Sequence, residues 1–149
     1  EWHTTNHATI WRWREAFQND FAARMDWTIK PYNKANHPPV VKLDNPTYIK
    51  AKQGERIDLS AIGTTDPDGD LLSYNWFCYE EASTRGMSSS RTGNKLDIMG
   101  FDHPKAWLIV KKSRVMRPGT GTMHIILAVT DNGSPRLTRY KRIIIDVVE

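Results

Sequence analysis

The chain has 149 residues, of which 39% are hydrophobic and 26% are charged, and its formal net charge is +4. This length suits one hydrophobic core with an appended element, and no apolar run approaches the roughly 20 residues of a membrane-spanning helix. The modest positive charge favours anionic surfaces only weakly, and the single cysteine, Cys78, excludes an intrachain disulfide. We therefore expect a folded, soluble domain with no membrane partner. Because the sequence starts at Glu1 without a signal peptide, we also expect a fragment or a processed product.

An apolar stripe predicts one amphipathic helix over residues 8–29. Its members recur at three- and four-residue spacing, namely Ile10, Trp13, Phe17, Phe21 and Met25. Such large side chains need a partner surface, so we interpret residues 1–30 as the closing helix of an upstream domain or as a helix docked on the C-terminal part of the chain. An aromatic platform for a ligand is the alternative. Residues 31–39 are polar and bounded by prolines, which predicts a linker and a domain boundary.

The pattern becomes strand-like from residue 40 to the end of the chain. Strands are expected near residues 40–43, 48–51, 56–62, 72–79, 95–98, 107–110, 123–130 and 139–148. Trp76 alternates in phase with Leu72 and Tyr74, and an inward tryptophan on a strand is typical of immunoglobulin-like domains. The segment 123–130 is apolar on both faces, which indicates a central strand. The predicted fold is mostly β, an immunoglobulin-like antiparallel β-sandwich over residues 40–149 preceded by one amphipathic N-terminal helix.

An acidic turn precedes the tryptophan strand and is the candidate metal site. Asp66, Asp68 and Asp70 alternate within it, and Ca²⁺ prefers six to eight oxygen ligands of this kind. Asp131, in the loop after the central strand, could lie at the same end of the sandwich. The turn also forms well without metal, because proline, glycine and aspartate all favour turns. We expect no cofactor, with calcium as the alternative.

Aromatic residues on strands are the candidate carbohydrate contacts, because the apolar face of a sugar stacks on a flat ring. Phe77 and Tyr79 lie on the strand face opposite Trp76, and Trp107 begins a later strand. The carbohydrate hypothesis predicts that at least two of these three rings are exposed and nearly coplanar. The alternative is that they lie under a long loop or under the N-terminal helix.

Basic residues gather in the C-terminal third of the chain, where they suggest a positive strip. They are Lys111, Lys112, Arg114, Arg117, Arg136, Arg139, Lys141 and Arg142. Such a strip could attract acidic polysaccharide or nucleic acid through charge. Basic side chains also protect edge strands from pairing with other chains, and we interpret the strip in this way. No nucleic-acid partner is therefore expected.

No pattern of catalytic residues stands out in the sequence. It has no HExxH, no GxSxG, no cysteine–histidine cluster and no glycine-rich phosphate loop, and its five histidines are scattered. We therefore predict that this chain is not an enzyme.

Several segments resemble known families. The segment DPDGDLLSYNW together with AVTDNGSP resembles bacterial cadherin-like and polycystic-kidney-disease-like modules. The segments WREAFQNDFAARMDW, WFCYEEAS and MHIILAVTDNGSPRLTRYKRIII resemble the cellulose-binding family that joins a nucleoside-hydrolase-like N-terminal domain to an immunoglobulin-like C-terminal domain. That family's catalytic DxDxxxDD motif is absent, so no catalytic residue carries over.

The resemblance implies a secreted or periplasmic polysaccharide-handling protein. Residues 1–30 would then end the hydrolase-like domain, and residues 40–149 would be a non-catalytic accessory module that binds a cellulose-like glycan. The alternative is a structural spacer that supports the neighbouring domain and is stiffened by calcium.

Overall fold

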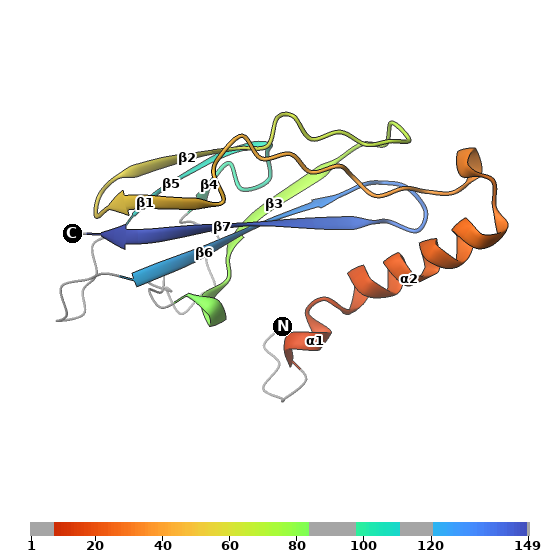
Figure 1. Ribbon diagram of the computed structural model, residues 1–149, viewed down its shortest axis with the longest axis horizontal. Coiled ribbons are helices and arrows are strands. Elements are labelled where there is room, and N and C mark those ends of the chain that lie inside the picture. The colour runs from red at the N-terminus through yellow and green to blue at the C-terminus, as the bar shows by residue number, and fades with distance from the viewer. Residues whose placement is uncertain (1–7, 84–97, 111–120, 149) are drawn as a thin grey trace.

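The computed structural model describes residues 8–83, 98–110 and 121–148, and two β-sheets make up most of it (Figure 1). The helical elements are α1 (Ala8–Trp11), α2 (Arg14–Ile29) and two short 3-10 helices, η1 (Tyr32–Lys34) and η2 (Glu80–Ala82). The strands are β1 (Tyr48–Lys52), β2 (Arg56–Ser60), β3 (Ser73–Cys78), β4 (Ile98–Met99), β5 (Lys105–Ile109), β6 (Gly121–Thr130) and β7 (Thr138–Val148).

One sheet has the strand order β1-β7-β6-β3 and the other has the order β2-β5-β4. All pairs are antiparallel except β1 with β7, which run parallel from Tyr48 opposite Ile144 to Lys52 opposite Val148. These two strands come from distant parts of the chain, so no tight turn forces them to be antiparallel. The apolar strand β6 lies between β7 and β3, which confirms the prediction of a central strand.

The core lies between the two sheets and is centred on Trp76. Its side chain is 1% exposed, and its indole Nε1 donates a hydrogen bond to the His103 carbonyl at 3.0 Å. The largest side chains buried with it are Leu59, Leu108, Ile125, Leu127, Leu137, Ile143 and Ile145. A two-sheet sandwich around an inward tryptophan confirms the predicted immunoglobulin-like fold.

The first predicted strand, at residues 40–43, is not formed. Val40 makes a single bridge with Thr65, and the edge of β2 is covered instead by the side chain of Asn45. The Asn45 amide donates to the Asp58 carbonyl at 2.8 Å and accepts from the Ser60 N–H at 2.7 Å. The asparagine side chain therefore replaces the backbone partner that a further strand would have supplied. Residues 95–97 of another predicted strand lie outside the described residues.

The N-terminal helix is interrupted at residues 12–13, and of the apolar stripe that predicted it, Trp13 packs against the sandwich while other members stay exposed. Phe17, Phe21 and Met25 are 50%, 65% and 49% exposed. The docked face contains Trp13 of that stripe together with Ala16, Asp20, Ala23 and Trp27. Ala23 is 1% exposed, so small side chains let the helix backbone approach closely. No helix in the described part of the chain is long and apolar enough to cross a membrane.

The segment predicted as a linker packs against the end of the sandwich. The Asn36 amide group donates to the Pro135 carbonyl at 2.8 Å, and the Asn36 carbonyl accepts from the indole of Trp27 at 2.8 Å. Asn36 is only 9% exposed. This contact ties the C-terminal end of α2 to the loop between β6 and β7.

Candidate functional sites

Phe77 and Tyr79 lie beneath a tryptophan of the N-terminal helical segment. The Trp13 ring centroid is 6.2 Å from each of these two rings and 5.0 Å from Tyr140 on β7, which it meets edge to face at 82°. Both Phe77 and Tyr79 are half-buried as a result. The predicted open platform is therefore covered by Trp13, as the alternative interpretation anticipated.

Two ion pairs reinforce the attachment of the N-terminal helical segment to the sandwich. Arg12 donates to Glu81 beside Tyr79, and this hydrogen bond holds the pKa of the Glu81 carboxyl below its usual range. Asp20 accepts from Arg24 at 2.7 Å and from Arg139 at 2.9 Å, so its pKa is also lowered, chiefly by the bond from Arg24. The pair of Asp20 with Arg139 joins the middle of α2 to the start of β7.

Trp107 is on the opposite outer face of the sandwich. Its neighbours in β5, Ala106 and Leu108, point into the core, so Trp107 points outward from the three-stranded sheet. The guanidinium of Arg56 lies 4.5 Å from the ring centroid, and Met99, opposite Trp107 in the register, is 47% exposed. The three predicted sugar contacts thus form two separate sites, because Phe77 and Tyr79 face outward from the other sheet.

A groove of about 590 Å³ separates α2 from the outer face of β6 and β7. Its helix side is formed by Trp13, Ala16, Phe17, Asp20 and Arg24, and its sheet side by Tyr79, Ile126, Thr138, Arg139, Tyr140 and Arg142. Burial raises the pKa of the Tyr140 phenol, whose ring forms part of this wall. Sequence reasoning missed the groove, although the alternation of Tyr140 and Arg142 on the last strand was a usable signal.

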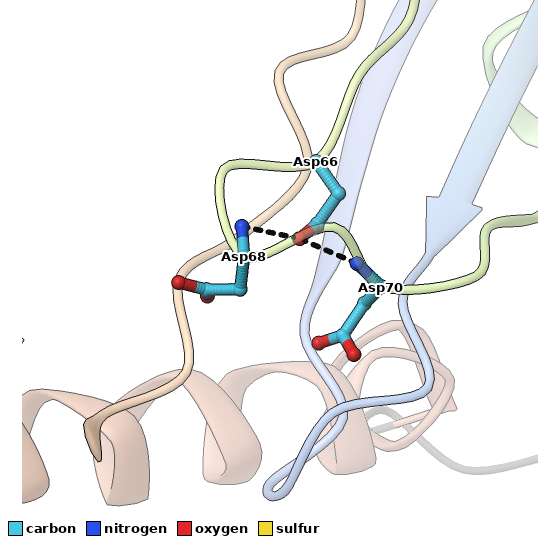
Figure 2. Close-up of side chains that lie close together, drawn as sticks. All are labelled: Asp66, Asp68 and Asp70. Atoms are coloured by element: carbon cyan, nitrogen blue, oxygen red, sulfur yellow. Dashed lines mark hydrogen bonds between the residues drawn. The ribbon is translucent and has the colours of Figure 1, made fainter. Parts of the chain in front are cut away.

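The acidic turn is closed by the carboxylate of Asp66. Figure 2 shows the Asp66 carboxylate accepting from the backbone N–H of Asp68 at 2.9 Å and of Asp70 at 3.2 Å. The Asp68 carboxylate accepts from the backbone N–H of His37 at 2.6 Å. Burial raises the pKa of the Asp70 carboxyl, and the negative charges of Asp66, Asp131 and Asp68 raise it further. Backbone N–H groups thus occupy one oxygen of Asp66 and one of Asp68.

The same three aspartates fit a cation in part. One oxygen of each lies within 4.8 Å of the others, and the second oxygen of Asp66 is buried without a hydrogen-bond partner in the described ranges. Asp131 does lie at this end of the sandwich, because the neighbouring Asn132 accepts from the Leu71 N–H at 2.7 Å. Asp131 itself is 2% exposed and accepts from Gly133 and Leu137 N–H groups and from Asn36. The oxygens of Asp131 are thus already bound by protein donors, so we do not group Asp131 with the aspartates of the turn as a candidate cation ligand.

Residues 56–147 match the family described as the C-terminal domain of cellulose-binding protein Sde0182. The chain belongs to this family. A solved structure from Saccharophagus degradans, described as a nucleoside hydrolase-related hypothetical protein associated with carbohydrate metabolism, is 36% identical to it with a TM-score of 0.78. The match covers 92% of this chain but only 32% of that protein, so the chain spans about a third of the length of that relative.

Other solved structures match the chain at lower similarity. A cis-dimer structure of protocadherin gammaB7 is 17% identical with a TM-score of 0.47, over 76% of this chain and 26% of that chain. Murine CRIg is 10% identical with a TM-score of 0.42, over 76% of this chain and 100% of that chain. No curated protein sequence matches the chain.

Proposed function

We propose that the chain is a non-catalytic accessory module that binds polysaccharide of the cellulose type, beside a hydrolase-like domain of the same secreted or periplasmic protein. The family match over residues 56–147 carries this proposal. The carbohydrate-metabolism association of the Saccharophagus degradans relative supports it, as does the length of that relative, which leaves room for a second domain.

The face around Trp107 is the stronger candidate surface for a neutral glycan. Met99 and Ile109 beside it are 47% and 46% exposed, and none of the described helices covers this sheet. A flat strand surface with an aromatic ring suits the flat apolar face of a glucan chain. Arg56 lies over one part of the ring and would have to move aside or contact the sugar hydroxyls. Trp13 packs against Phe77 and Tyr79, so a sugar could contact only the parts of these two rings that Trp13 leaves exposed.

Binding to insoluble cellulose and to soluble glucans, by pull-down and affinity electrophoresis, tests this proposal. Trp107→Ala should weaken binding about fivefold, because an aromatic contact contributes on the order of 1 kcal/mol beyond the area it buries. Phe77→Ala and Tyr79→Ala should have smaller effects. Tyr48→Ala is the matched control, since this tyrosine is 49% exposed on the other sheet. Equal losses in all four variants, or no binding by the wild type, would contradict the proposal.

A structural spacer is the second candidate, and the outer stripe of α2 favours it. Phe21 and Met25 form this outer stripe, an apolar surface of α2 on which their side chains are 65% and 49% exposed. Surfaces of this kind are usual at contacts with other domains. A spacer would bind no glycan across a broad panel while it still held its neighbouring domain in place.

Calcium would stiffen such a spacer at the acidic turn. Asp66, Asp68 and Asp70 would supply carboxylate oxygens, and the bound cation would offset the negative charge gathered there. The melting temperature of the wild type should then rise by a few degrees when calcium replaces a chelator, because a ligand that binds only the folded state stabilises it. Asp66→Asn should abolish the rise, and an unchanged wild type would exclude calcium.

A further inference from the structure

The groove between α2 and the outer face of β6 and β7 is separate from the surface described around Trp107. We propose that this groove binds the carboxylate-bearing sugar units of an acidic polysaccharide, a polyuronate. This inference rests on the proposed polysaccharide-binding function and adds to it a second site and a ligand class. The groove has a volume of about 590 Å³, within the range typical of small-ligand sites.

The charges in the groove favour an anionic ligand. Three arginines, Arg24, Arg139 and Arg142, and one carboxylate, Asp20, line it, so its net charge is +2 (three positive minus one negative). Asp20 is already bound by Arg24 and Arg139. Arg142 is exposed and makes no ion pair or side-chain hydrogen bond with the residues that the structure describes. A guanidinium offers two parallel N–H groups that match a carboxylate, so Arg142 is suited to bind a uronate.

The walls of the groove supply the apolar contacts that a sugar ring needs. Phe17 on the helix side is 50% exposed and Tyr140 on the sheet side is 39% exposed. Trp13 meets the Tyr140 ring edge to face, which holds that ring in place. Aromatic rings beside guanidinium groups combine stacking on the pyranose with recognition of its carboxylate.

The groove is held in shape before any ligand binds. The Trp13 contacts fix the N-terminal end of α2, and the hydrogen bond from Trp27 to Asn36 fixes its C-terminal end. Between them, Asp20 and Arg139 set the distance from the helix to β7. A site that is formed in advance loses less conformational freedom when it binds.

A polysaccharide fits this site better than an acidic peptide. The groove is lined by side chains on the face of β6 and β7, whereas an added peptide strand pairs with the backbone at the edge of a sheet. The groups on offer are guanidinium and aromatic side chains, which match the carboxylate and the ring faces of a uronate chain.

Calorimetric titration of the 149-residue chain with oligogalacturonate and with a neutral cello-oligosaccharide tests the proposal. Arg142→Gln should weaken oligogalacturonate binding about tenfold, the effect of one lost charged hydrogen-bonded contact, and leave the neutral ligand unaffected. Lys141→Gln is the matched control, because Lys141 is exposed on the same strand but does not line the groove. Added salt should weaken only the oligogalacturonate interaction.

Each other outcome has a defined meaning. The groove proposal is overturned if neutral glycan binds at Trp107 while oligogalacturonate either does not bind or binds without dependence on Arg142. The proposed function would then still stand. If neither ligand binds, both the groove proposal and the proposed function are overturned. Polyglutamate bound as tightly as oligogalacturonate, with the same dependence on Arg142, identifies a general carboxylate or peptide site and overturns the glycan assignment. Tyr140→Ala separates these cases, because loss of stacking should weaken the uronate and not the peptide.

Discussion

Replacement of Trp13 by alanine should release the N-terminal helix from the sandwich without unfolding the sandwich. Trp13 is half-buried and contacts three rings, with centroid distances of 5.0 Å to Tyr140 and 6.2 Å to Phe77 and Tyr79. Truncating a fully buried tryptophan costs about 3–5 kcal/mol, so the half-buried Trp13 should contribute about 2 kcal/mol to helix docking. The core around Trp76 contains no atom of Trp13 and should keep its stability.

Hydrogen exchange measured separately for the helix and the strands is the appropriate assay. A loss of about 2 kcal/mol corresponds to roughly 30-fold faster exchange of the α2 amides, while the β6 amides should be unchanged. Phe21→Ala is the control, because Phe21 is 65% exposed on the outer side of the same helix. Its exchange rates should stay within about twofold of the wild type.

Two results would refute this reasoning. Equal acceleration of α2 exchange in Trp13→Ala and Phe21→Ala would mean that the docked face has been assigned to the wrong side of the helix. Acceleration in β6 as large as in α2 would mean that the helix and the sandwich form one cooperative unit.

Three further changes test the interior and the acidic turn. Asp131→Ala should lower the free energy of unfolding by about 3 kcal/mol in a urea titration, because it removes the acceptor of two loop N–H groups and of Asn36; a loss below about 1 kcal/mol would contradict this role. Trp76→Phe should cost about 2 kcal/mol by the same measurement, through a cavity and the lost bond to the His103 carbonyl, and an unchanged midpoint would be inconsistent with the packing. Asp70→Asn should stabilise the protein at neutral pH by less than about 1 kcal/mol, since the pKa of this carboxyl is raised in the folded state and its ionisation disfavours folding. That gain should disappear as the pH falls below the unfolded-state pKa of about 3.9, and a gain that persists in acid would contradict the electrostatic cause.

Local patterns were sufficient to predict most of the sandwich. The alternation around Trp76 placed it in the core, and the doubly apolar run of β6 placed that strand inside its sheet. Asp66 bonds to the backbone of its own acidic turn, so that part of the turn is also a local property. In each case the physical cause acts within a few residues, through the two-residue period of a strand or the geometry of one turn.

The candidate sites depended on contacts between distant segments. Strand parity correctly turned Phe77 away from the core, but it could not say that Phe77 and Trp107 leave opposite sheets or that Trp13 covers one of them. The large apolar side chains of α2 did not indicate which face docks on the sandwich, because the helix approaches the sheet through its small residues and through Asp20, whose partner Arg139 is 119 positions away. The sequence by itself therefore determined most of the residues that form strands and which of their faces is buried, although residues 40–43 do not form the expected strand. Only the tertiary structure decided which outer face is covered and where a groove stays open, because these depend on long-range packing that no local period encodes.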